Sequence, residues 1–298
     1  MTNFSLSSAL KAAWLCGLFL LSGCGCSSDE KSGSASEEIV YGPDDVPSIE
    51  SVARDAFAKG DFSAAETAAR RLSEDKTLPA AAQSEGWNIL GAISARKASK
   101  PGAAQEAAAD ARCKYLRAIV LDPGNFGARY NLACLYRDEF RSNRAAYVLF
   151  GACAAALSPS GDPYGAKAAA AAEKLAGQAR ARRGAKKGAL PRDAVKAPAS
   201  GICKDLDAFA WEDHAWDDAK ANAKYAELLV TARMDAKRGN LKILAAELAS
   251  DILASRPPDD VKALIAFAKS IVADLKAVGR AKTAAVYEEF RAFLQERR

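Results

Sequence analysis

The side chains of this 298-residue chain that are best suited to catalysis surround His214, its single histidine. The segment WEDHAWDD spans residues 211–218. In a helix, His214 and Asp218 would share a face, where carboxylates and an imidazole can bind a divalent metal ion. Without a second histidine or an HExxH motif, an acidic helix start with two packing tryptophans is the better interpretation. A metal-dependent enzyme centred on His214 stays open as an alternative.

Other catalytic signatures are missing from the sequence. It contains no glycine-rich loop after a strand pattern, no GxSxG motif and no nucleophile placed with a histidine base. We therefore expect a protein that is not an enzyme and that needs neither a cofactor nor a metal ion.

The composition indicates which elements must position the side chains. Alanine accounts for 68 residues, whereas only 8% of the residues are aromatic. Alanine is the best helix former and lacks the β-branch that favours sheets. The sequence therefore predicts an all-α protein, and it argues against a β-sandwich, a collagen-like chain and a small disulfide-rich scaffold.

The N-terminus carries the pattern of an export signal. The apolar run over residues 12–21 is too short to span a bilayer and suits the core of a signal peptide. The motif LSGC at residues 21–24 resembles the lipobox of bacterial lipoproteins. That resemblance implies a signal peptide over residues 1–23 and a lipid anchor on Cys24. The following residue is glycine rather than aspartate, which implies the outer membrane, facing the periplasm.

The alternative is an ordinary signal peptide cleaved nearby, and both interpretations place the rest of the chain outside the cytoplasm. Residues 24–46 are rich in serine, glycine and acidic side chains. Such a segment buries too little apolar surface to fold, so it is predicted to be a flexible tether.

Repeated landmarks follow the tether. WNILG at residues 87–91 begins a unit that continues with ARCKYLRA at 111–118 and ends at Pro123. RYNLACLY at residues 129–136 begins the next unit, which ends at Pro159. These positions resemble the tetratricopeptide repeat (TPR), in which W-x2-L-G opens one helix and A-x3-F…P closes its partner. The resemblance implies an all-α, TPR-like solenoid of helical hairpins.

A partial unit precedes these two. Gly60 is predicted to end one helix in the left-handed conformation, and Phe62 to begin its partner. In the second unit, small residues such as Gly91 let two helices approach, while large residues such as Tyr115 fill the holes beside them.

The second unit also departs from the repeat. Ser94 stands where the pattern has tyrosine, and residues 97–110 predict a lengthened turn. A non-repetitive, alanine-rich helical bundle is the alternative architecture.

Breaker and charge signals divide the rest of the chain. Residues 47–179 form the predicted TPR array, closed by a capping helix that begins at Asp162-Pro163. Residues 180–204 are predicted to be a basic linker. Residues 205–298 are predicted to form a smaller helical, TPR-like domain of two hairpins, with Gly279 breaking its last helices apart.

The first helix of each TPR hairpin usually lines the peptide-binding face. The resemblance therefore implies a binding face on this chain that includes Arg54, Asn88, Arg96, Tyr130 and Arg137. The three arginines favour a peptide with acidic residues or a free C-terminal carboxylate. The two-lysine, two-asparagine clamp of chaperone-binding TPR domains is not present. An ordinary charged surface is the alternative.

Cysteines and the basic linker leave further alternatives open. Outside the signal peptide and the lipidated position, the cysteines are Cys26, Cys113, Cys134, Cys153 and Cys203. An odd number leaves at least one thiol free or paired between molecules. Cys134 and Cys153 are expected either to form a disulfide or to be small buried thiols. The linker is a solvated segment or is attracted to an anionic membrane surface, and no aromatic residues accompany its cations for nucleic-acid binding.

Together these features predict a membrane-tethered protein–protein interaction adaptor, or scaffold, of the bacterial cell envelope. Its expected partners are other envelope proteins, bound through the TPR face, and the membrane, bound through the N-terminal lipid. No nucleic acid is expected. A self-associating structural lipoprotein without a peptide ligand is the main alternative, and it allows a homo-oligomer.

Overall fold

A computed structural model describes residues 46–100, 105–140, 142–184, 258–277 and 279–297. These residues contain nine α-helices, one short 3-10 helix and no strand. The helices are α2 (Val46–Lys59), α3 (Phe62–Glu74), α4 (Ala80–Ala98), α5 (Gln105–Leu121), α6 (Phe126–Asp138), α7 (Asn143–Leu157), α8 (Pro163–Gly184), α12 (Val261–Ala277) and α13 (Ala281–Gln295). The predicted all-α class is therefore confirmed. Cys24 and the His214 segment lie outside the described residues.

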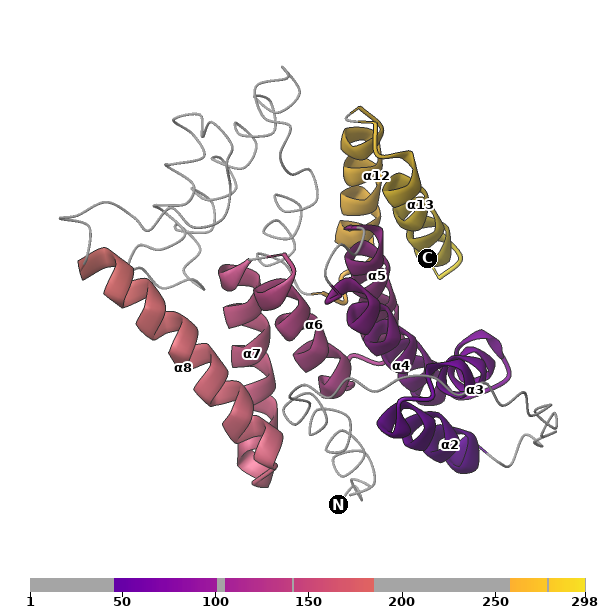
Figure 1. The fold of residues 1–298 in the computed structure, drawn as a ribbon, viewed down its shortest axis with the longest axis horizontal. Coiled ribbons are helices and arrows are strands. Elements are labelled where there is room, and N and C mark those ends of the chain that lie inside the picture. The colour runs from indigo at the N-terminus through magenta and orange to yellow at the C-terminus, as the bar shows by residue number, and fades with distance from the viewer. Residues whose placement is uncertain (1–45, 101–104, 141, 185–257, 278, 298) are drawn as a thin grey trace, which may run out of the picture.

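The helices pack mostly as sequential antiparallel pairs. The pairs are α2 with α3, α4 with α5, α6 with α7, and α12 with α13. The first pair contacts the second through α3 on α4, the second contacts the third through α5 on α6, and the single helix α8 packs on α7. Figure 1 shows this succession running from α2 and α3 to α8, with α12 and α13 beside α5. Short connections favour this arrangement because they return the chain alongside the helix that it has just left.

Local signals set the turns between paired helices. Gly60 has a φ of 82°, so the first turn uses the left-handed conformation that glycine adopts without strain. Helix α3 begins at Phe62, and the Asp61 carboxylate accepts a hydrogen bond from the Ala64 amide at 3.0 Å. Gly279 has a φ of 76° between α12 and α13. The predicted roles of both glycines are confirmed.

The turn inside the second pair is shorter than the sequence predicts. Helix α4 continues to Ala98 and α5 begins at Gln105, so most of the predicted turn over residues 97–110 is helical. The alanine-rich stretch that follows Gln105 favours helix more strongly than turn. Bonds between α4 and α5, described below, hold this part of α5 in place.

Small residues let neighbouring helices approach closely, as predicted for Gly91. A methyl group added at Gly91 would lie 2.7 Å from ring atoms of Tyr115, whose side chain is buried. At Gly86 the close neighbour is backbone rather than a side chain. A methyl group added there would lie 2.7 Å from the Ala69 carbonyl oxygen and from the Ser73 amide nitrogen, both in α3. The pairing of α3 with α4 therefore depends on Gly86.

Replacing Gly86 by alanine is expected to lower the free energy of unfolding by about 1–3 kcal/mol, because the backbone of α3 must move. Gly151, inside α7, is a matched control because an added methyl group meets nothing within 4 Å. Gly151→Ala is expected to raise the free energy of unfolding by about 0.5–1 kcal/mol through helix propensity. Urea denaturation measures both changes, and effects of the same sign would contradict the close approach at Gly86.

Helices α8 and α12 each begin next to an aspartate that accepts a backbone hydrogen bond. Helix α8 begins at Pro163, as predicted, and the Asp162 carboxylate accepts a hydrogen bond from the Tyr164 amide at 2.8 Å. Asp260 accepts a hydrogen bond from the Ala263 amide at 2.9 Å and so caps α12. Side chains of α12 and α13 share one hydrophobic core with α5, α6 and α7. The sequence carries no local signal for that shared core. No helix of the described part is long and apolar enough to cross a membrane.

Candidate functional site

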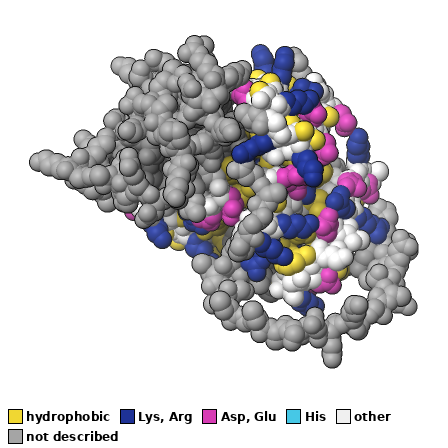
Figure 2. All heavy atoms as spheres, turned by 45° about the horizontal axis from the view of Figure 1, so that its top comes forward, with side chains coloured by type: hydrophobic (Ala, Val, Ile, Leu, Met, Phe, Trp, Pro, Cys, Tyr) yellow, Lys and Arg dark blue, Asp and Glu magenta, His cyan; other side chains and the backbone are white. Residues whose placement is uncertain are grey.

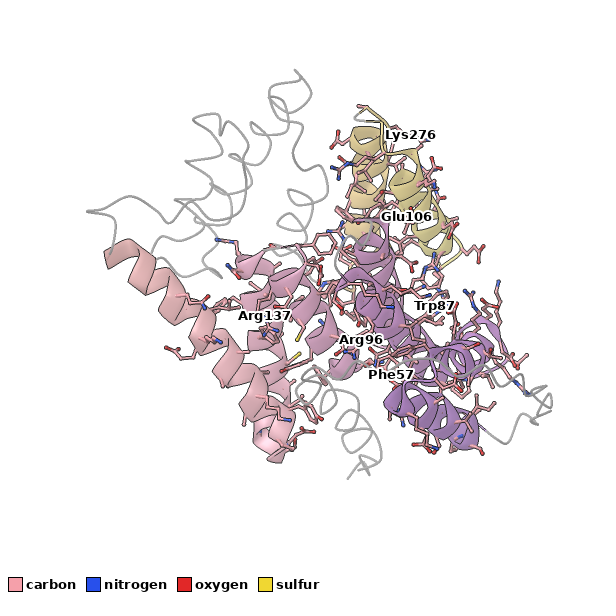
Figure 3. The ribbon with its side chains drawn as sticks, in the orientation of Figure 1. Phe57, Trp87, Arg96, Glu106, Arg137 and Lys276 are labelled. Atoms are coloured by element: carbon pink, nitrogen blue, oxygen red, sulfur yellow. The ribbon has the colours of Figure 1, made fainter. Side chains whose placement is uncertain are left out.

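The predicted binding residues lie along the first helices of the three successive pairs. Arg54 is on α2, Asn88 and Arg96 are on α4, and Tyr130 and Arg137 are on α6. These helices contact one another in order, α2 with α4 and α4 with α6. We call α2, α4 and α6 the first-helix row. In Figure 3, Arg96 lies between Arg137 and Phe57.

A continuous chain of polar contacts crosses this row. The Arg54 guanidinium donates two hydrogen bonds to one Glu85 oxygen, at 2.9 and 3.0 Å. The Asn88 amide donates to the other Glu85 oxygen at 3.3 Å, and the Asn131 amide donates to the Asn88 oxygen at 3.0 Å. Glu50 also pairs with Arg54, at 3.4 Å. We call these five residues the polar ladder.

The ladder changes the chemistry expected at Arg54. This arginine faces two carboxylates, and its side chain is 16% exposed while that of Glu85 is 13% exposed. Its charge is therefore balanced within the protein, because closely paired ions in a partly buried setting offset one another. Glu85 and Asn131 are absent from the sequence-based set. Glu85 precedes Asn88 by three residues, which places both on one helix face, but nothing local indicates that Asn131 of α6 meets them.

An aromatic cluster lies beside the ladder's last helix, α6. The Tyr130 ring packs edge-on against Phe150 at 5.2 Å and against Tyr164 at 6.3 Å between centroids. The Arg137 guanidinium lies 5.7 Å from the Phe150 ring, and the Lys167 ammonium lies 4.7 Å from the Tyr164 ring. The Arg137–Phe150 contact joins α6 to α7, the Lys167–Tyr164 contact lies within α8, and the Tyr130–Tyr164 ring pair joins α6 to α8.

Arg137 also has a carboxylate partner. Its Nε and Nη2 atoms each bond to an Asp138 oxygen at 2.7 Å, and this pairing raises the pKa of Arg137. Asp138 is more than half exposed, with a side-chain exposure of 53%. A ligand carboxylate can therefore replace Asp138 without opening the protein core.

Arg96 lies near the C-terminal end of α4, the central helix of the first-helix row. It lies in the last turn of α4, eight residues after Asn88, which is about 12 Å along the helix axis. The three predicted arginines thus lie on three different helices of the row, and Arg54 and Arg137 each have a carboxylate partner. Figure 2 shows basic and acidic side chains interspersed over the face in view.

A serine beside a lysine occurs on α4 and α5. The Ser94 hydroxyl donates to an Asp110 oxygen at 2.6 Å, and the Lys114 ammonium donates to Ser94 at 2.9 Å and to Asp110 at 2.6 Å. Ser94 is only 2% exposed, so this hydroxyl is closed to a substrate. The cluster instead joins α4 to α5, and it accounts for the departure from the repeat pattern at Ser94.

The described cysteines are free thiols. Cys113 and Cys153 are buried and Cys134 is half-buried. The disulfide considered between Cys134 and Cys153 is not formed in the structure; the Cys153 thiol contacts the Phe126 carbonyl oxygen at 3.7 Å instead. Burial raises the pKa of each of the three thiols to about 12.

Native Cys113 is expected to react with iodoacetamide at pH 8 about 1,000-fold more slowly than in urea, because only the thiolate reacts and its pKa is raised by about three units. The rate should rise about tenfold per pH unit up to pH 11. The raised pKa of Cys113 also makes the stability depend on pH. Its contribution to the free energy of unfolding is complete below about pH 9, where the thiol is protonated in both states, and it is lost as the pH rises towards 12. Mass spectrometry of the Cys113 peptide measures the rate, and equal rates in buffer and urea would contradict the burial.

The described residues contain no group of three or more histidine, cysteine, aspartate or glutamate side chains that could hold a metal ion. The segment around His214 lies outside the part of the chain that the structure covers. No family model matches the chain, and no match was found among curated proteins or solved structures.

Proposed function

We propose that this protein is a TPR-like adaptor of the bacterial cell envelope, held at the outer membrane by a lipid on Cys24 and facing the periplasm. In this proposal the first-helix row binds an extended segment of another envelope protein. The observation that carries the proposal is the polar ladder, which runs without interruption from α2 through α4 to α6.

The spacing of the row suits an extended peptide. Packed helices lie roughly 10 Å apart, and an extended chain rises about 3.3 Å per residue, so a peptide laid across the row meets a new helix every three residues. A ladder that joins the three helices keeps these contact points in register. Such preorganisation lowers the entropy cost of binding.

The polar ladder lies mostly beneath the proposed binding surface and positions the residues that form it. Asn88 is 1% exposed, so it acts beneath the surface and orients Glu85 and Asn131 on either side of it. Asn131 is half-buried, and its bond to Asn88 holds α6 against α4 beneath the proposed binding face. Arg96 and Arg137 then recognise acidic side chains or a terminal carboxylate.

Site-directed photocrosslinking of the lipidated protein in its native membrane tests this function. A photoreactive amino acid at Ser99 lies one helical turn after Arg96 and is exposed. It should capture a different envelope protein, identified by mass spectrometry, whereas the same amino acid at exposed Lys269 of α12 should not. Capture of the chain by itself alone would reject the adaptor and favour the self-associating scaffold. No capture from Ser99 in any growth condition would reject the proposed face.

A further inference from the structure

The hairpin of α12 and α13 lies across the junction between the second and third helix pairs. Helix α13 packs on α5 of the second pair. Side chains at both ends of the hairpin reach further, to α4 and to α6. The hairpin is therefore in contact with two successive pairs at once, as its place beside α5 in Figure 1 suggests.

Arg112 of α5 is the centre of this contact. It is fully buried, and its guanidinium lies 5.6 Å from the Phe267 ring of α12 and 5.1 Å from the Tyr287 ring of α13. It also donates a hydrogen bond to the Tyr287 hydroxyl. On its other side, the guanidinium lies 4.3 Å from the ring of Phe140, which follows α6. One arginine thus joins the second pair, the third pair and the hairpin.

A second stack fixes the hairpin one and a half turns further along α5. The Arg117 guanidinium lies 4.5 Å from the Trp87 ring of α4 and 5.3 Å from the Phe293 ring of α13. Trp87 and Phe293 also pack edge-on at 6.2 Å. Arg297 covers the Phe293 ring at 4.8 Å, so cations and aromatic rings alternate across the interface.

An ion pair ties the hairpin to the third pair independently. Arg129 of α6 bonds to Asp259, just before α12, at 3.3 Å. The arginine side chain is 12% exposed and the aspartate 33%, so solvent screens this pair only in part. At the C-terminal end of the hairpin, Lys76 and Glu296 pair at 3.5 Å. Their side chains are 83% and 66% exposed, so this ion pair contributes little to stability.

In a linear array of hairpins, each pair contacts only its neighbours, so a single interface sets the angle between successive pairs. An element that packs against two successive pairs adds a second interface and so restricts the angle between them. We propose that the α12–α13 hairpin is a brace that holds the second and third pairs at a fixed angle. The brace then keeps Asn88 of α4 and Asn131 of α6 within hydrogen-bond distance, a consequence for ligand binding that rests on the proposed function.

Hydrogen exchange of the full chain, followed by mass spectrometry without any ligand, tests the brace. Phe293→Ala removes a half-buried ring from the Arg117 stack and leaves the buried residues of α13 in place. We expect amide exchange to become about three- to tenfold faster in α6 as well as in α12 and α13, while α2 keeps its rate. Glu288→Gln is the control, because it breaks only the 2.6 Å pair with Lys276 inside the hairpin.

A charge exchange keeps the test decisive even if Phe293→Ala disturbs the whole fold. Asp259→Arg should also accelerate exchange in α6, and adding Arg129→Glu should slow it again relative to Asp259→Arg alone, although Arg129 also donates two hydrogen bonds to the Pro123 carbonyl that the glutamate cannot make. If faster exchange stays confined to α12 and α13 in these variants, the hairpin does not restrain the second and third pairs, and the brace is rejected. Because no partner is present, this result is independent of whether the first-helix row binds a peptide.

Discussion

Replacing Arg96 and Arg137 together by glutamate is expected to reduce recovery of the envelope partner at least tenfold. In the proposed function both guanidinium groups bond to ligand carboxylates, and two glutamates would repel them. The loss of charge-assisted bonds costs more than the roughly 1.4 kcal/mol that a tenfold change in affinity requires. Affinity purification from solubilised membranes, quantified by mass spectrometry, measures the effect.

The control for this pair must change the net charge equally at another surface. Lys262→Glu with Lys269→Glu does so on exposed positions of α12. Helicity measured by circular dichroism should stay unchanged in both double variants, since all four side chains lie outside the buried core. Undiminished recovery with the arginine pair, or an equal loss with the lysine pair, would discard the first-helix row as the recognition surface.

Tyr287→Ala is expected to be among the most destabilising single substitutions in the described chain. The Tyr287 side chain is fully buried, packs edge-on against Phe267 at 6.0 Å and accepts a hydrogen bond from Arg112. Removing a buried aromatic ring costs about 3–5 kcal/mol, and here it also uncovers a buried guanidinium. Guanidinium chloride denaturation of the chain lacking residues 1–24 should show this as a lower midpoint.

Tyr287→Phe separates the two contributions. It keeps the ring and removes only the hydroxyl that Arg112 contacts, so we expect a smaller loss of about 1–3 kcal/mol. Lys282→Ala on the exposed side of the same helix should change stability by less than about 0.5 kcal/mol. A Tyr287→Ala variant as stable as Lys282→Ala would show that the hairpin does not share the core of the array.

The polar ladder alters what the arginines of the row can do. The residue types alone predict three arginines that bind an acidic peptide, whereas Arg54 is already paired with Glu50 and Glu85. Its role is then to hold α2 against α4. In the proposed function, an anionic ligand would bond to Arg96 and to Arg137, whose partner Asp138 is exposed.

Features that depend on a few neighbouring residues could be read from the sequence. The left-handed turn at Gly60, the start of α8 after Asp162 and the break at Gly279 follow from local backbone preferences, and all three are confirmed. The close approach at Gly91 was also predictable, since Gly91 and Tyr115 belong to one hairpin whose connection limits how its helices can meet.

Contacts between distant segments could not be predicted from local sequence signals. Asn88 meets Asn131 across 43 residues, and Arg112 meets Tyr287 across 175. Helical periodicity shows which face of a helix is apolar, but not which other helix covers it or at what register. Local sequence signals were sufficient to predict an all-helical chain with turns at Gly60 and Gly279. The ladder, the free thiols and the docking of α12 and α13 on α5 arise only when side chains far apart in the chain pack together, because their partners are set by the three-dimensional register of the helices.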